Sequence, residues 1–167
     1  MTATTKAPLG ATTGNRKWYC DINSGPTDTP VWVGLFGIQE FKHTTEPSMQ
    51  DDSDFDGDGW KSEVNTANKW SIDGKVKRGV KDGSTPPVYD PGQEILRLAA
   101  GKTGGENVVE IRWYEMEANG PRVEAYQGFA AVKFTEEGGG MDALSTASFT
   151  LSGRGKRNII THPDDGV

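Results

Sequence analysis

The stretch Thr146-Ala147-Ser148-Phe149-Thr150-Leu151-Ser152 alternates apolar and polar side chains without a break. Apolar residues at every second position place one face of an extended strand against a core and leave the other face in water. The same period of two recurs over residues 109–113 and 70–76. These runs predict a mainly antiparallel β fold.

Further strands are predicted around these runs. The apolar residues of segment 123–134 change phase near Gly128, and one extra residue in a strand predicts a β-bulge there. A short strand is expected from Trp18. Residues 31–41 predict either a pair of strands or one long strand kinked at its glycines.

One segment carries helix signals. Asp90 is suited to the N-cap, Pro91 to the first helical position, Gln93 to the third position of a capping box, and Gly101 to the end. The residues expected to face the core are Ile95, Leu98 and Ala99. Strands, one helix and then strands predict a β-sandwich or barrel with one flanking helix.

Composition limits the function. The chain has 167 residues, a formal net charge of -6, one cysteine and two histidines. One domain is expected, tight nucleic-acid binding is disfavoured, and neither an internal disulfide nor a multi-histidine metal site can form. No apolar run approaches the roughly 20 residues of a membrane-spanning helix. Neither a Gly-x-Ser-x-Gly motif nor a complete phosphate-binding loop is present, so we expect no enzyme and no cofactor.

The segment from about His43 to Asn68 is strongly acidic. It contains seven acidic residues and one lysine, a net charge of -6. The pattern predicts a long, solvated loop between strands, and such loops are often functional. Asp52, Asp54, Asp56 and Glu63 also match the ligand spacing of a calcium-binding EF-hand loop. The β-like sequence that follows argues against the flanking helices of an EF-hand, so calcium binding is the alternative interpretation.

The remaining segments complete the domain plan. Residues 1–16 are rich in Thr, Ala, Gly and Pro and predict a flexible N-terminal arm, followed by a domain over 17–163 and a C-terminal tail over 164–167. Two basic clusters occur, each either on the wet side of strands or complementary to the acidic loop of another copy. They are Lys75, Lys77, Arg78 and Lys81, and Arg154, Lys156 and Arg157.

The chain resembles the major tail tube proteins of long-tailed, siphovirus-like bacteriophages. The resemblance covers about residues 17–163 and rests on the order and spacing of several segments. They are 32–41 (WVGLFGIQEF), 57–62 (GDGWKS) with 68–72 (NKWSI), 126–132 (YQGFAAV), and 149–155 (FTLSGRG) with 159–163 (IITHP). An inner tube of a contractile tail, or of a phage-derived injection particle, is expected to look much the same.

The resemblance implies a virion structural protein that is made in the cytoplasm of a bacterial host. Six copies form a ring, rings stack into a tail tube, and DNA passes transiently through the lumen during ejection, without a membrane partner. Other partners implied are the tape measure, tail terminator and tail tip proteins. The long loop is implied to contact the adjoining ring through Asp51, Asp52, Asp54, Asp56, Asp58 and Trp60. A secreted sugar-binding β-sandwich is a third, weaker interpretation.

Overall fold

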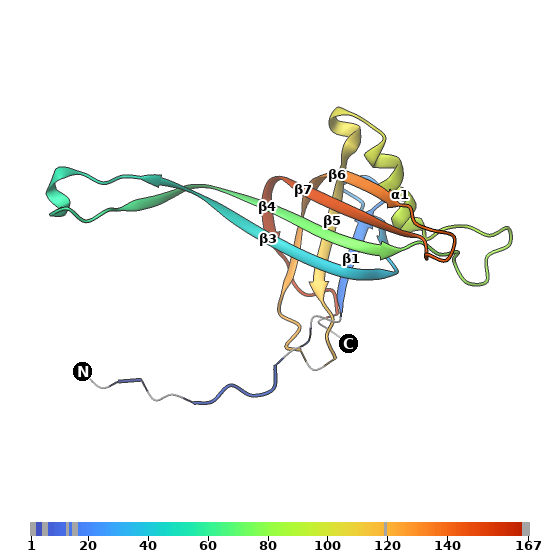
Figure 1. The fold of residues 1–167 in the computed structure, drawn as a ribbon, viewed down its shortest axis with the longest axis horizontal. Helices are drawn as coiled ribbons and strands as arrows, with labels where there is room; N and C mark the ends of the chain where they lie inside the picture. The colour runs from blue at the N-terminus through green and yellow to red at the C-terminus, as the bar shows by residue number, and fades with distance from the viewer. Residues whose placement is uncertain (1–2, 5–6, 13, 15–16, 119, 165–167) are drawn as a thin grey trace.

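The computed structural model describes the chain apart from residues 1–2, 5–6, 13, 15–16, 119 and 165–167. The predicted N-terminal arm and C-terminal tail therefore lie partly outside the described residues. The elements, in chain order, are β1 (Trp18–Asn23), β2 (Trp32–Gly34), β3 (Ile38–Asp51), η1 (Phe55–Gly57), β4 (Glu63–Lys77), α1 (Pro91–Ala100), η2 (Gly104–Asn107), β5 (Val108–Glu115), β6 (Ala125–Glu137) and β7 (Thr146–Ile159) (Figure 1).

The strands form one seven-stranded sheet in the order β2-β1-β5-β6-β7-β4-β3, and each neighbouring pair is antiparallel. The sheet folds over itself, so that β3 and β4 lie across β1 and β5 (Figure 1). Ring contacts join the two halves: Trp18 of β1 stacks on Phe41 of β3, with centroids 5.6 Å apart. The mainly β fold with one flanking helix is confirmed, and its two layers come from a single sheet.

Trp70 of β4 is central to the core between the two layers. Its ring stacks on Trp113 of β5 at a centroid distance of 4.9 Å, and its Nε1 donates to the Gly155 carbonyl at 2.9 Å. A Cβ atom at Gly153 would lie 2.4 Å from this ring, and one at Gly128 would lie 2.8 Å from it. Both positions need glycine because the indole occupies the space of a side chain.

The expected strands are found at the predicted places. Ala147, Phe149 and Leu151 are buried, as the alternation in this stretch predicts. The β-bulge predicted near Gly128 is confirmed by a register shift between Gln127 and Phe129. The segment 31–41 is divided into β2 and the start of β3, with Gly37 between them at a φ of 80°.

Helix α1 covers one end of the sheet (Figure 1). The predicted start is confirmed, because the Asp90 side chain accepts from the Gln93 backbone N–H, and Gly101 follows the last helical residue. The reciprocal half of the capping box is absent. The buried Gln93 amide instead donates to the carbonyls of Phe36 and Lys77, at 2.8 and 2.9 Å. The Gln93 side chain therefore links the helix to the segment before β3 and to the end of β4.

The predicted core face of α1 was wrong in part. Leu98 is exposed, whereas Leu96 is completely buried beside Ala99. The helix docks through Gly92, where an added Cβ would lie 2.5 Å from the Gly34 carbonyl oxygen. This close approach turns the face containing residues 92, 96 and 99 inward, a spacing of four and three residues.

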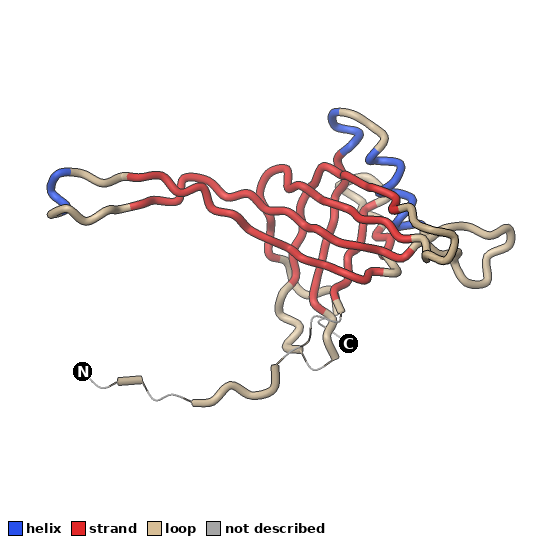
Figure 2. The backbone as a smooth tube through the Cα atoms, in the orientation of Figure 1, coloured by secondary structure: helices blue, strands red, loops and turns tan. Residues whose placement is uncertain are grey.

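The prediction of a long loop from about His43 to Asn68 was also wrong. β3 and β4 pair continuously from Ile38↔Val76 to Asp51↔Glu63, with two register shifts, and only residues 52–62 form the connection. Figure 2 shows this as a long red ribbon projecting from the sheet. Residues 45–51 and 63–69 were not predicted as strands because they lie beyond the core and are exposed, so their sequence has no apolar alternation to detect.

Candidate functional site

The most distinctive feature is the hairpin arm, defined here as residues 45–70. β4 pairs with β7 only between Ser71 and Lys77. From Trp70 back to Glu63, β4 therefore pairs with β3 alone. The seven residues of β3 from Thr45 to Asp51 extend this ribbon by about 24 Å before the turn begins. Pro47 is compatible with β3 because β3 is an edge strand of the sheet, where a missing N–H is tolerated.

The arm ends in the tip, defined as residues 52–62. Its conformation is fixed by local hydrogen bonds: the Asp52 N–H donates to the Ser62 carbonyl at 3.1 Å, and the Ser62 N–H donates to the Ser53 hydroxyl at 2.8 Å. The Asp54 carboxylate accepts from the Asp56 N–H at 3.1 Å and caps η1. The tip is therefore a shaped turn.

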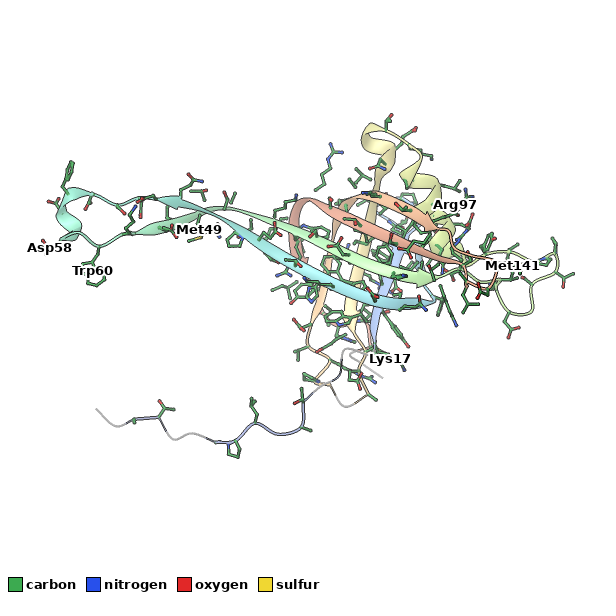
Figure 3. The ribbon with its side chains drawn as sticks, in the orientation of Figure 1. Lys17, Met49, Asp58, Trp60, Arg97 and Met141 are labelled. Carbon is green, nitrogen blue, oxygen red and sulfur yellow. The ribbon has the colours of Figure 1, made fainter. Side chains whose placement is uncertain are left out.

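The tip presents two large apolar side chains to solvent. Phe55 is 107% exposed and Trp60 is 82% exposed, and Figure 3 shows Trp60 pointing away from the arm. Met49 and Val64, on the strands of the arm, are also exposed. Large apolar side chains on an isolated projection contribute nothing to the core of their own subunit, so they favour a surface that another molecule covers.

The acidic residues of the arm are all exposed. Asp51 forms an ion pair with Lys61 at 3.5 Å, and hydrogen bonds from Ser53 hold the pKa of the Asp51 carboxyl below its ordinary range. Asp52, Asp54, Asp56, Asp58 and Glu63 form no ion pair with any described residue. The tip is thus a compact, negatively charged projection.

Asp52, Asp54 and Asp56 of the calcium-loop pattern lie in this tip, and Glu63 is the first residue of β4, so the pattern is flanked by strands and not by helices. Among the described residues, no group of three or more His, Cys, Asp or Glu side chains is placed to hold a metal ion. One of the candidate ligands, Asp54, already caps the backbone of η1. Calcium binding at Asp52, Asp54, Asp56 and Glu63 stays a prediction that only a titration tests.

A groove lies at the root of the arm, where β4 and β7 separate. Beyond Ser152, β7 follows β6 as far as Ile159, whereas β4 continues into the arm. The fork between them leaves a groove of about 490 Å³. Its lining residues are Thr45, Asn68, Lys69, Trp70, Gly153, Gly155, Lys156 and Arg157. This groove, here called the fork groove, is lined by three basic residues, Lys69, Lys156 and Arg157. The sequence did not predict that these three residues lie together.

A second cavity lies where the two ends of the folded sheet approach each other. Residues of β1 and the first residues of β3 line about 440 Å³, together with Leu35 and the exposed Phe36. The outer edge of β3 has no strand partner among the described residues. An unpaired edge of 14 residues is a ready template for pairing with another chain.

The buried polar residues support the fold. Asp21 accepts from Arg112 at 2.8 Å and from the Tyr114 hydroxyl at 3.1 Å, and His162 contacts the Glu115 carbonyl at 2.8 Å. Burial raises the pKa of the Cys20 thiol, which makes it a poor nucleophile. These side chains join strands to one another.

The basic clusters have separate roles that the sequence did not distinguish. Arg78 is buried and contacts Gln93, Glu94 and Glu136, at 3.2, 3.0 and 3.4 Å. Lys75 is paired with Glu137 at 2.8 Å. Lys75 lines a separate groove together with its partner Glu137, whereas Lys156 and Arg157 of the second cluster line the fork groove with Lys69 of the arm. The separation of β4 from β7, which brings these residues together, has no local sequence signal.

No family model matches the chain, and no curated protein matches its sequence. Solved structures do match its fold. A chain in the tail of an empty gene transfer agent particle, with C6 symmetry, has a TM-score of 0.64 at 12% identity, covering 90% of this chain and 100% of that one. The virion of a native gene transfer agent particle contains a match with a TM-score of 0.62, also at 12% identity, with the same coverage.

A sixfold-symmetrised baseplate of the anti-feeding prophage contains a further match. Its TM-score is 0.60 at 7% identity, covering 93% of this chain and 99% of that one. The chain therefore has a fold that occurs in the tails and baseplates of phage-like particles. In the described part of the chain, no helix has the length and apolar character needed to cross a membrane.

Proposed function

We propose that this protein is a virion structural protein that assembles into the tube of a phage-type tail. Six copies form a ring, rings stack into a tube, and DNA passes through the lumen during ejection. The fold similarity supports a tail component, because the matching chains occur in particles with C6 or sixfold symmetry. Their low identity leaves the tube assembly itself as our proposal.

The observation that carries the proposal is the hairpin arm. A ribbon that leaves the sheet and ends in exposed Phe55 and Trp60 has no apolar contact to make within one copy. In a stacked tube it contacts the adjoining ring, with Asp51, Asp52, Asp54, Asp56, Asp58 and Trp60 as the contact residues. Head-to-tail association of this kind does not close along its axis and therefore gives a tube.

The sheet supplies a second argument. Its outer edge at β3 and the cavity beside β1 are open in one copy. Pairing such edges around a ring removes them, and obligate interfaces of this type bury about 2,000 Å² or more. Residues 17–163 would form the ring subunit, residues 1–16 would supply a second joint between subunits, and residues 164–167 would be a C-terminal tail.

The charge of the chain fits a conduit for DNA. A net charge of -6 disfavours adhesion of phosphates to a lumen wall, so DNA can slide without being held. We further propose a location in the virion tail after synthesis in the host cytoplasm. Tape measure, tail terminator and tail tip proteins would be its partners, and no catalysis or cofactor is involved.

Electron microscopy of concentrated purified protein in negative stain tests this proposal. Hollow rods or sixfold rings are expected, with terminator or tip proteins added where growth needs a starting point. Solitary compact particles under all of these conditions would contradict it.

A further inference from the structure

The fork groove is a basic surface that forms no ion pair with any acidic residue that the structure describes. Lys69 and Lys156 form no ion pair with any described residue, and Arg157 packs over the Tyr126 ring with its guanidinium carbon 4.2 Å from the centroid. Glu46 lies opposite Lys69 in the strand register but forms no ion pair with it. The three cations therefore remain available to a negatively charged ligand.

The tip has the complementary chemistry. It carries Asp52, Asp54, Asp56 and Asp58 within seven residues, against one lysine that already pairs with Asp51. Hydrogen bonds fix the backbone of the turn that carries these residues, which lowers the entropy lost when the tip binds. Opposite charges on two shaped surfaces favour docking in one register and disfavour other contacts.

The tip cannot reach the groove of its own chain. The two sites lie at opposite ends of the arm, and paired strands hold them about 24 Å apart (Figure 3). We propose that the fork groove of one copy receives the acidic tip of a second copy, with Lys69, Lys156 and Arg157 facing the tip carboxylates. This inference rests on the proposed function and identifies the surface that the arm contacts.

Disulfide trapping between two variants that each gain one surface cysteine tests the contact. Asp56→Cys places a thiol in the tip, and Lys156→Cys places one in the groove; Cys20 is buried and does not compete. A size tag on one variant identifies the mixed cross-link. The matched control replaces the groove variant with Met141→Cys, a fully exposed position at the other end of the body (Figure 3).

Mild oxidation of the mixture at low salt is expected to give about tenfold more tip-to-groove product than control product. Raising the salt to 1 M shortens the Debye length from about 10 to about 3 Å, so the yield should fall toward the control. Equal yields for the two pairs at low salt overturn the inference. If rods form but the tip-to-groove pair and the control pair cross-link equally, the inference fails and the proposed function stands. If the tip-to-groove pair cross-links into oligomers but neither rings nor rods form, the inference stands and the proposed function fails.

Charge exchange gives an independent test. Asp52→Lys with Asp56→Lys, and Lys156→Glu with Arg157→Glu, should each reduce assembly, and mixing the two proteins should recover the tip-to-groove contact between them. Asp28→Lys with Glu106→Lys is the control for the first pair, since both acids are exposed and lie elsewhere. Failure of the mixture to assemble better than either protein alone contradicts the inference.

Discussion

Replacing Gly153 with alanine tests how the arm is anchored to the sheet. A Cβ at this position would lie 2.4 to 2.5 Å from three atoms of the Trp70 indole. The ring cannot move aside freely, because it stacks on Trp113 and donates to the Gly155 carbonyl. Relief of the clash must therefore displace the root of the arm, the end of β7, or both.

The magnitude follows from two contributions. Overpacking a core position costs about 1 to 3 kcal/mol, and loss of the Trp70 hydrogen bond adds about 1 kcal/mol. We expect Gly153→Ala to lower the free energy of unfolding by about 2 to 4 kcal/mol, and the melting temperature by roughly 5 to 15 °C. Urea unfolding followed by tryptophan fluorescence measures the first quantity, and calorimetry measures the second.

Two comparisons make the test specific. Gly138→Ala adds a methyl group where no atom lies within 4 Å, so it should change stability by no more than about 0.5 kcal/mol. Trp70→Phe removes part of the indole, so Gly153→Ala should cost about 1 to 2 kcal/mol less in that background. The reasoning is refuted if Gly153→Ala is as stable as Gly138→Ala, or if its cost is the same with phenylalanine at position 70.

Three further predictions concern the tip, the helix and pH. Replacing Phe55 and Trp60 with serine should raise the protein concentration needed for assembly about tenfold or more, because exposed aromatic anchors dominate interfaces, while the melting temperature stays unchanged. Sedimentation measures the assembled fraction, and an assembled fraction equal to that of the wild type would contradict this prediction. Gln93→Ala should destabilise the fold by about 2 to 3 kcal/mol in urea unfolding, since the Phe36 and Lys77 carbonyls lose a buried donor; a neutral result contradicts that role. Hydrogen bonding to Arg97 and Arg78 lowers the pKa of Glu94, so the stability that this carboxylate contributes is present above its unfolded pKa and is lost as the pH falls through its folded pKa. The free energy of unfolding of Glu94→Gln should therefore depend less on pH than that of the wild type below about 4.3. Equal pH dependence of the two proteins would count against the ion pairs.

The calcium alternative has its own measurement. Titration of the purified protein with calcium, followed by calorimetry and tryptophan fluorescence, is expected to give no saturable binding, because Asp54 is engaged in capping and the tip is closed by its own hydrogen bonds. Saturable binding that Asp52→Asn abolishes would favour the calcium-binding interpretation.

The elements over a buried core were predictable from sequence. Phe149 and Leu151 alternate with polar residues because their strand has one face in the core and one in water. Asp90 and Gly101 mark the ends of α1 because capping is a local interaction. The bulge at Gly128 followed from a change of phase, whereas the close contact of Gly128 with the Trp70 ring on another strand was not predicted.

The arm and the fork groove were not predictable in the same way. A two-stranded ribbon in solvent has no buried face, so its polar sequence is typical of a loop. The groove lies where β4 stops pairing with β7, next to the close contact of Trp70 with Gly153, and both features join residues that are far apart in the sequence. The candidate contact residues of the arm came from the acidic segment together with the resemblance to tail tube proteins, while their proposed counterparts needed the three-dimensional structure.

Imaging of a tipless variant tests the central claim most directly. Residues 52–62 are replaced with Asn-Gly, which joins the paired residues Asp51 and Glu63 through a tight hairpin turn and leaves the sheet intact. Under conditions in which the wild-type protein forms hollow rods, the variant should form single rings or monomers with unchanged thermal stability. Rods of the variant as long as those of the wild type would contradict the account.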